Sequence, residues 1–342
     1  MSTLLKLQMA EGFRETASRP CGRKIVWEDN GTLNVGDSDF AQPEFLGHIG
    51  GVDCPIALDA KRGVAWVYCC QYRLGVKDYS EIREFDLTTR RSRRLLRLGL
   101  HQWAIWMLTH WAEANSLLAL VATDTRAAMV HIRHHLALID TRSGQMHLVA
   151  LPRDAFVPLA ICTRRRWVIF HGAEGTHLIS IQGRHLKTLP PGGPAGRGAS
   201  IHPVRPLALV GGDGIWLWDL EKGTSTRIRD RGQFPHWSPD GRGFWFSESS
   251  SDLFYWNYET GAEKRVLRFV GNPYPEINYS RPITISPDGK RLAVSLTRML
   301  KVDPDVLEKT PTLARLHRMC VVDLEKCEAW IAPGYARNFA WV

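Results

Sequence analysis

Short apolar runs of strand length recur along this 342-residue sequence, and each is bounded by residues that favour turns. Two of these runs are near-copies. Residues 234–242 and 282–290 each pass from an apolar segment into Ser-Pro-Asp-Gly and then a basic residue. In such a turn proline fixes φ at the first corner, aspartate bonds its own backbone, and glycine takes the position that needs a positive φ. Strand-like runs follow both turns, at 244–247 and 292–295, so the pattern predicts antiparallel strand pairs.

Both copies continue into a second pair of strand-like runs. The first copy leads to residues 253–261 and the second to residues 319–326, and in each an apolar run ends in an acidic or polar turn. The unit is therefore strand, Ser-Pro-Asp-Gly turn, strand, strand, polar turn, strand. A repeated unit of four short strands is typical of one β-propeller blade.

These residues resemble the repeats of TolB-type and WD-repeat propellers. The resemblance rests on the two turns and on the third-strand motif Trp-Leu-Trp-Asp-Leu-Glu-Lys-Gly at 216–223. It implies an all-β fold, a seven-bladed β-propeller of four-stranded antiparallel blades, since blades of about 40 residues fill the length. Six or eight blades stay open if a divergent repeat is misread. The resemblance implies little about function, because scaffolds, receptors and a few enzymes share this repeat.

We expect one propeller domain over residues 1–342. Residues 337–342 read like the strand that precedes Ser-Pro-Asp-Gly, and we expect them to pair with the N-terminal blade and close the ring. An open propeller would leave unpaired strand edges. The expected blades are residues 12–50 with 337–342, 52–98, 102–151, 156–190, 199–230, 233–270 and 281–333.

Composition narrows the class of protein. Thirteen Trp and twelve Phe suit packing between sheets. A net charge of +9 favours acidic partners, but it is spread too widely along the chain to favour nucleic acid. Seven cysteines without a C-x-x-C pair indicate reduced thiols. With no signal-like start and no apolar run long enough to span a bilayer, we expect a cytoplasmic protein.

Three insertions, residues 71–80, 123–135 and 297–317, fall between the second and third strands of their blades. Loops at that point gather on one face of a propeller, where binding usually resides. The insertions and a nearby connection are rich in basic residues, which predicts a cationic face for an acidic partner; an ordinary solvated surface is the alternative. The candidate binding residues are Arg73, Lys77, Arg126, Arg133, Arg281, Arg298, Lys301, Arg315 and Arg318.

One tight histidine cluster, His131, His134 and His135, raises the question of a metal. A site would need further ligands from another blade, and the neighbouring Arg133 disfavours a cation. A loop that becomes the third strand is the preferred interpretation, and we expect neither metal nor cofactor.

Catalytic signatures are missing from the sequence: there is no G-x-S-x-G elbow, no H-E-x-x-H and no P-loop. His236, Ser238 and Asp240 are triad residue types, but they belong to a turn in which they have structural roles. The sequence therefore favours a non-enzymatic scaffold that binds a protein or peptide. The alternative is a propeller lyase or hydrolase acting on an acidic polysaccharide. This chain is similar to uronate-cleaving propeller lyases in repeat and size, although His317 stands alone where they have a metal-binding cluster.

Overall fold

Over the residues that it describes, the computed structural model consists of short β-strands joined by turns and one single-turn 3-10 helix, η1 (Ala112–Ala114). The described residues are 6–9, 14–15, 24–29, 31–37, 43–50, 54–73, 76–98, 102–103, 107–123, 133–151, 155–172, 175–189, 198–248, 252–270, 276–277, 283–299, 315–331 and 337–342.

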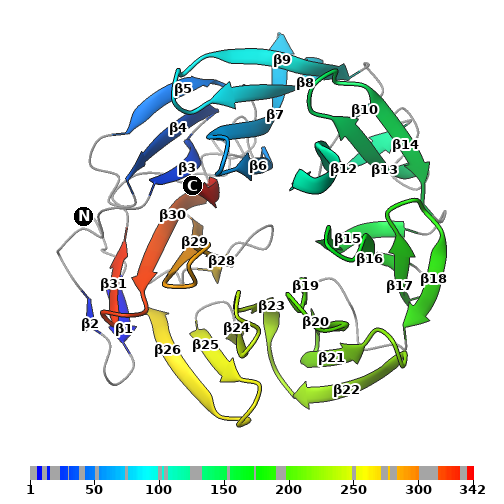
Figure 1. The fold of residues 1–342 in the computed structure, drawn as a ribbon. Coiled ribbons are helices and arrows are strands. Elements are labelled where there is room, and N and C mark those ends of the chain that lie inside the picture. The colour runs from blue at the N-terminus through cyan, green and yellow to red at the C-terminus, as the bar shows by residue number, and fades with distance from the viewer. Residues whose placement is uncertain are drawn as a thin grey trace. The chain divides into compact units, whose positions relative to one another are not determined.

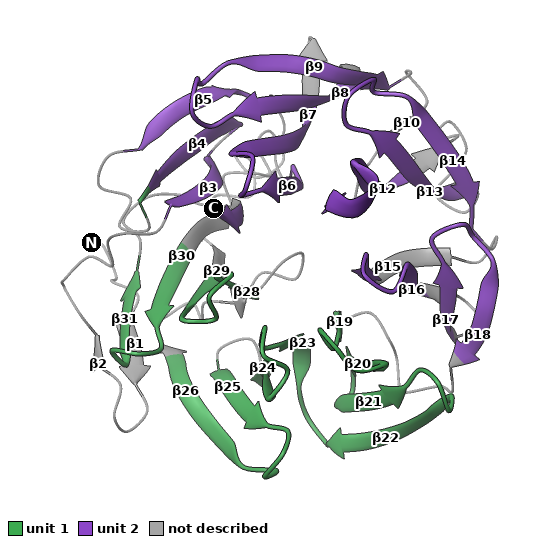
Figure 2. Ribbon diagram, in the orientation of Figure 1, with its two compact units in different colours: residues 1–23, 37–41, 192–337 green, residues 24–36, 42–191, 338–342 purple. Residues whose placement is uncertain are grey.

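The chain forms two compact units (Figure 2). Unit 1 comprises residues 1–23, 37–41 and 192–337, and unit 2 comprises residues 24–36, 42–191 and 338–342. Together they hold seven sheets (Figure 1). Their strands confirm the predicted class, an all-β seven-bladed propeller of four-stranded antiparallel blades.

Unit 2 contains four of the sheets. Their strands, in sheet order, are β32 (Arg337–Trp341), β3 (Lys24–Asp29), β4 (Thr32–Asp37) and β5 (Glu44–His48); β6 (Ile56–Asp59), β7 (Val64–Arg73), β8 (Val76–Asp86) and β9 (Ser92–Leu98); β10 (Gln102–Trp103) and β11 (Leu108–Trp111), which both pair with β12 (Ser116–Thr123), then β13 (Arg133–Asp140) and β14 (Met146–Ala150); β15 (Ala155–Cys162), β16 (Trp167–Gly172), β17 (Gly175–Ser180) and β18 (His185–Leu189).

Unit 1 contains the other three sheets. Their strands are β19 (Ala199–Ile201), β20 (Leu207–Gly211), β21 (Ile215–Asp219) and β22 (Thr224–Arg229); β23 (Gln233–Trp237), β24 (Gly243–Glu248), β25 (Asp252–Asn257), β26 (Glu263–Val270) and β1 (Lys6–Met9); β27 (Glu276–Ile277) and β28 (Ile283–Ile285), which both pair with β29 (Arg291–Met299), then β30 (Arg315–Asp323), β31 (Glu328–Ile331) and β2 (Arg14–Glu15).

The C-terminal strand completes an N-terminal sheet, as expected. β32 lies beside β3, and the Val342 amide donates to the Lys24 carbonyl at 2.9 Å. Phe339 and Trp341 are buried, so this strand adds apolar contact as well as backbone hydrogen bonds. In the part of the chain that is described, no helix has the length and apolar character needed to cross a membrane.

The two Ser-Pro-Asp-Gly turns join β23 to β24 and β28 to β29, each linking the first and second strands of a blade. In both, the serine hydroxyl donates to the aspartate carboxylate at 2.5 Å. The glycine has φ +71° in one turn and +72° in the other, a conformation that side chains disfavour. The structure thus bears out the turn chemistry that the sequence predicts.

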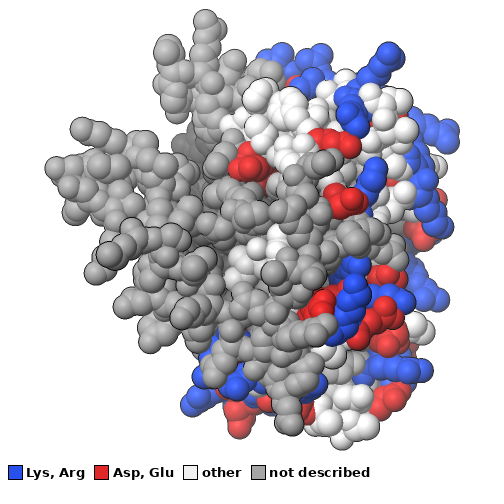
Figure 3. Space-filling view, turned by 90° about the vertical axis from the view of Figure 1, so that its left-hand side faces the viewer, with Lys and Arg blue, Asp and Glu red and all other residues white. Residues whose placement is uncertain are grey.

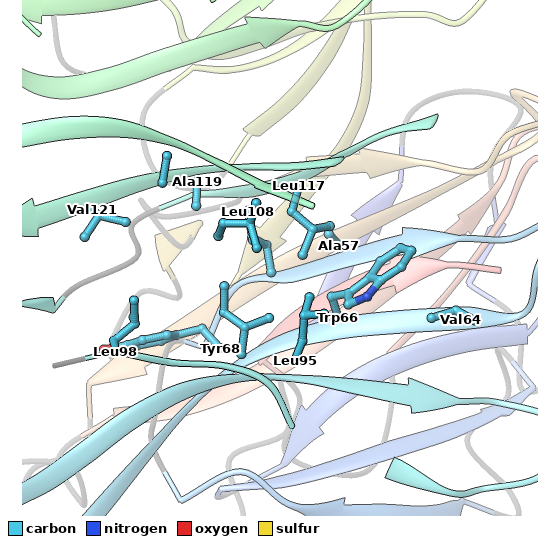
Figure 4. Packing of buried hydrophobic residues seen from close by; sticks show 13 residues of the cluster. Ala57, Val64, Trp66, Tyr68, Leu95, Leu98, Leu108, Leu117, Ala119 and Val121 are labelled. Atoms are coloured by element: carbon cyan, nitrogen blue, oxygen red, sulfur yellow. The ribbon is translucent and has the colours of Figure 1, made fainter. Parts of the chain in front are cut away.

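Large side chains fill the space between neighbouring sheets of one unit. In unit 2, a cluster of 13 buried residues lies between the β6–β9 sheet and the sheet of β10–β14 (Figure 4). Strand periodicity divides β7 between two such clusters. Trp66 and Tyr68 join this one, whereas Ala65 and Val67 join the cluster shared with the β3–β5 sheet. The aromatic content is thus used as packing between blades.

The N-terminal residues add strands that the sequence pattern does not predict. β1 pairs antiparallel with β26 as a fifth strand of its sheet, and β2 pairs parallel with β31. Both additions lie at the outer edge of a unit 1 blade. They cover strand edges that would otherwise be open to pairing.

Candidate binding site

The structure describes part of the predicted basic face. Arg126, Arg281 and Lys301 lie outside the described residues. The others lie in strands: Arg73 ends β7, Lys77 is near the start of β8, Arg133 begins β13, Arg298 is in β29, and Arg315 and Arg318 are in β30. The face as a whole stays a prediction.

In unit 2, most of the insertion expected at 71–80 is strand. β7 has 10 residues and β8 has 11, compared with five each in β20 and β21. The β8–β9 pairing begins at Ser80, so residues 71–73 and 76–79 pair with each other beyond the flanking strands. Arg73 and Lys77 are carried on this projecting hairpin, near its tip.

In unit 1, β29 and β30 form a second long hairpin, with nine residues in each strand. Its register pairs Arg298 with Leu316 and Met299 with Arg315. β31 pairs with β30 at residues 320–323, and within the described chain no strand lies beside residues 315–319 on that side. The hairpin therefore carries Arg298, Arg315 and Arg318. Because β27 lies beside residues 296–297 of β29, only residues 298–299 and 315–316 pair with each other beyond it.

The histidine cluster is partly in a strand. His131 lies outside the described residues, whereas His134 and His135 belong to β13 and pair with Ala122 and Val121. These positions agree with the expectation that the histidine cluster lies where a loop continues into the third strand of its blade. No group of three or more His, Cys, Asp or Glu side chains suited to a metal occurs among the described residues.

Unit 1 also holds a cavity of about 640 Å³ that sequence reasoning missed. It lies between two adjacent blades, against both Ser-Pro-Asp-Gly turns, and its size suits a side chain or a short peptide segment. One signal was present in the sequence: two copies of the same turn in consecutive blades. Its lining residues are Ser238, Pro239, Asp240, Trp245, Tyr255, Lys264, Val266, Pro287, Asp288, Gly289, Leu324 and Cys327.

Two ionisable groups of this cavity, Asp240 and Tyr255, have pKa values shifted away from neutrality. Although burial opposes it, hydrogen bonds from Ser238 and the Arg242 amide lower the pKa of the Asp240 carboxyl. Burial, followed by the charge of Asp240, raises the pKa of the Tyr255 hydroxyl. At neutral pH the carboxylate is ionised and the phenol is protonated. Neither group is poised to exchange a proton near pH 7.

The triad residue types are held by the turn itself. The Ser238 hydroxyl donates to Asp240 and to the Gly243 carbonyl at 2.8 Å, and it accepts from the Gly243 amide at 3.2 Å. The Nδ1 atom of His236 lies 2.9 Å from the carbonyl oxygen of its neighbour Trp237. Burial lowers the pKa of His236, which favours the neutral ring. The serine hydrogen bonds are therefore used in closing the turn.

Comparison with known proteins identifies the fold. No protein-family model and no curated protein sequence matches the chain. TolB from Acinetobacter baumannii is similar in structure, with a TM-score of 0.51 and 14% identity over 94% of this chain and 66% of TolB. This chain thus spans just under two thirds of that protein. An oligogalacturonate lyase in complex with manganese is similar with a TM-score of 0.57 and 12% identity, over 85% of this chain and 93% of the lyase.

These similarities, with the seven sheets, define the class of protein: a TolB-like β-propeller. At 14% and 12% identity they bear on the fold alone. One of the two neighbours is named as a lyase, so the fold is compatible with both enzymatic and binding roles.

Proposed function

We propose that this protein is a non-enzymatic propeller that binds a protein or peptide with an acidic surface through its long basic hairpins. The observation that carries the proposal is the pair of extended second-to-third-strand hairpins, β7–β8 and β29–β30. Strands rise about 3.3 Å per residue, so the three or four extra residues of β7 and β8 reach roughly 10–13 Å past the flanking strands.

The chemistry of these hairpins suits a protein partner. Arg73 and Lys77 on one, and Arg298, Arg315 and Arg318 on the other, supply cations within a few residues of each tip. In the described structure, residues 315–319 of β30 also have a strand on one side only. An extended peptide can add to such an edge through main-chain hydrogen bonds, while arginine recognises its carboxylates.

A lyase acting on an acidic polysaccharide is the second candidate. The specific observation in its favour is the likeness to the oligogalacturonate lyase, which covers 93% of that chain. The same basic side chains would then bind uronate carboxylates.

Affinity capture from the source cell, using the full chain, tests the first proposal. The test variant is R298E/R315E/R318E, and the matched control is R205E/K222E/R242E, which reverses three exposed cations in other turns. A stoichiometric partner that is purified and rebound in calorimetry should lose at least about tenfold in affinity with the test variant, as charge reversal predicts, and little with the control. Equal loss with both variants would contradict the proposed surface.

The second candidate has its own assay. The purified chain is incubated with polygalacturonate and Mn²⁺, and unsaturated uronate product is followed by ultraviolet absorbance. Turnover that is lost on chelation and restored by Mn²⁺ would establish the enzyme and overturn the scaffold proposal.

A further inference from the structure

The opposite end of the unit 2 sheets carries a second set of cations. The turns at this end join first to second strands and third to fourth strands, whereas Arg73, Lys77 and Arg133 lie where second strands meet third strands. We name the exposed basic residues of these turns the basic turn surface. Its members are Lys61, Arg62, Arg90, Arg91, Arg142, Arg164, Arg166 and Arg184.

Hydrogen bonds within each blade join its two turns. The Leu87 amide donates to the Gly63 carbonyl at 2.9 Å, and the Ile181 amide donates to the Arg166 carbonyl at 2.8 Å. In the blade between them, the Thr141 hydroxyl donates to the Asn115 carbonyl at 2.9 Å. First-to-second and third-to-fourth turns are therefore joined in all three blades.

Contacts between blades join these pairs of turns. The Arg93 guanidinium donates to the carbonyls of Thr141 and Arg142, at 3.0 Å and 3.4 Å. The Arg166 guanidinium lies 5.4 Å from the ring centroid of Trp111 in the preceding blade. The basic turn surface is thus continuous across three blades of one unit.

The charge of this surface is one-sided. Within its turns Glu113 is the single acidic residue. Asp59, Asp86 and Asp140 precede the turns, and each accepts two backbone amides of its own turn at 2.7–3.1 Å. These carboxylates offset part of the positive charge but are directed into the turn backbone. Outside the turns, Glu44 of β5 forms an ion pair with Arg90 at 2.7 Å and offsets that cation as well.

Equivalent turns of unit 1 provide an internal comparison. Their basic and acidic residues are equal in number: Arg205, Lys222, Arg242, Lys290 and Lys326 against Glu221, Asp240, Glu259, Asp288 and Glu325. Over its described part, the face in view in Figure 3 mixes Lys and Arg with Asp and Glu. The arginine excess therefore belongs to the unit 2 turns and not to this kind of turn in general.

Two of these arginines occupy backbone positions that favour glycine. Arg90 has φ +60° and Arg166 has φ +57°. At the matching turn positions, Gly144 of the neighbouring blade corresponds to Arg90 and Gly63 of the β6–β9 blade corresponds to Arg166, with φ +72° and +63°; the blade between has Asn115 at φ +47°. A non-glycine residue in this conformation costs folding free energy, and such strain tends to occur at functional sites. Both arginines are exposed; Arg90 pairs with Glu44 at 2.7 Å, and Arg166 lies over the Trp111 ring.

From this geometry we propose that the basic turn surface binds the phosphodiester backbone of duplex nucleic acid. The fork of guanidinium donors matches phosphate oxygens, and seven of the eight cations are arginine. Hot spots of protein interfaces are enriched in Trp and Tyr as well as Arg, and these turns expose no such aromatic side chain where the structure describes them. The large exposed hydrophobic side chains of the described chain, Phe45 and Val204, lie outside these turns. Trp66 and Trp111 are buried beneath the arginines, so they are not available to stack on unpaired bases.

Fluorescence anisotropy of a labelled mixed-sequence DNA duplex, with the full chain, tests this proposal. The test variant is R62Q/R91Q/R142Q/R166Q and the control is R205Q/K222Q/R242Q. If about four phosphates are neutralised, the logarithm of affinity should fall with the logarithm of salt at a slope of about −3.6. Affinity should then drop roughly 150-fold between 50 and 200 mM salt. The test variant should lose most of this slope, and the control should keep it.

A second variant, R90G/R166G, separates binding from folding. Glycine relieves the backbone strain, so this variant should melt at or above the wild-type temperature while binding duplex more weakly. A wild-type chain that fails to bind at 50 mM salt, or equal loss in test and control variants, would overturn the proposal. Tighter binding to polygalacturonate, or to vesicles of phosphatidylglycerol, than to duplex would overturn the assignment to nucleic acid.

Discussion

Replacing Arg229 with methionine tests how two blades of unit 1 are held together. Arg229 ends β22, and its guanidinium forms ion pairs with Glu248 at 2.9 Å and Glu263 at 2.8 Å, both on the next sheet. The same group lies 4.9 Å and 5.2 Å from the ring centroids of Phe246 and Phe254. One cation thus separates two carboxylates and covers two aromatic rings.

The expected loss follows from burial. Breaking a fully buried ion pair costs about 3–5 kcal/mol, because a charge is left without a partner. Glu248 and Glu263 keep side-chain exposures of 26% and 28%, so solvent screens part of that cost. We expect R229M to lower the free energy of unfolding by about 2–3 kcal/mol near neutral pH. R227M on the same strand is the control, since its partner Asp230 is 91% exposed, and it should cost less than about 1 kcal/mol.

The pH dependence of the R229M loss distinguishes an electrostatic effect from lost packing, because lost packing would cost the same at every pH. Burial already raises the pKa of Glu263 in the presence of Arg229, and Glu248 raises it further. Removing the Arg229 cation should raise the pKa of Glu263 further. A carboxyl whose pKa is higher in the folded state binds more protons when folded, so stability falls as pH rises through that pKa and returns as pH falls. Urea denaturation followed by tryptophan fluorescence should show a smaller R229M penalty at pH 5 than at pH 8. An equal penalty at both would refute the electrostatic account.

Three further predictions concern turns and strand pairing. Gly144→Ala should destabilise the chain by at least about 2 kcal/mol in urea, because φ is +72° and a Cβ would lie 2.0 Å from a backbone oxygen of β9; unchanged stability would contradict this geometry. Removing strand β32 should cost several kcal/mol through the lost burial of Phe339 and Trp341, and an unaltered urea midpoint would count against its pairing with β3. Arg166→Gly should stabilise by roughly 0.5–1 kcal/mol, since the left-handed backbone costs more than the added freedom of the unfolded chain, and Arg90→Gly should stabilise less because it also removes the exposed ion pair with Glu44; a lower thermal midpoint would show that the arginines support the turns.

Local chemistry explains which parts of the fold were predictable. The Ser-Pro-Asp-Gly turns and the C-terminal strand follow from residue patterns within a few positions of one another, and the structure bears them out. β1 and β2 were not predictable in this way. They are four and two residues long, and their pairing with β26 and β31 depends on partners from the other end of the chain.

The candidate sites, like the fold, could be predicted from the sequence only in part. The sequence indicates where the insertions fall, but not that β7 and β8 continue as a paired hairpin through most of the first one. Nor does total charge reveal the basic turn surface. Its cations are separated by whole strands in the sequence, and they become neighbours through contacts such as that of Arg93 with Thr141.

The pairing of β32 with β3 has a consequence for synthesis of the chain. Strands β3 to β5 emerge early, yet their sheet is one member short until residues 337–341 have been translated. Throughout that interval an uncovered backbone edge is available to chaperones, to nascent neighbours on the same messenger, or to the wrong strand of this polypeptide. Slow or interrupted translation just before residues 337–341 should therefore increase misfolding more than interruption between two of the central blades.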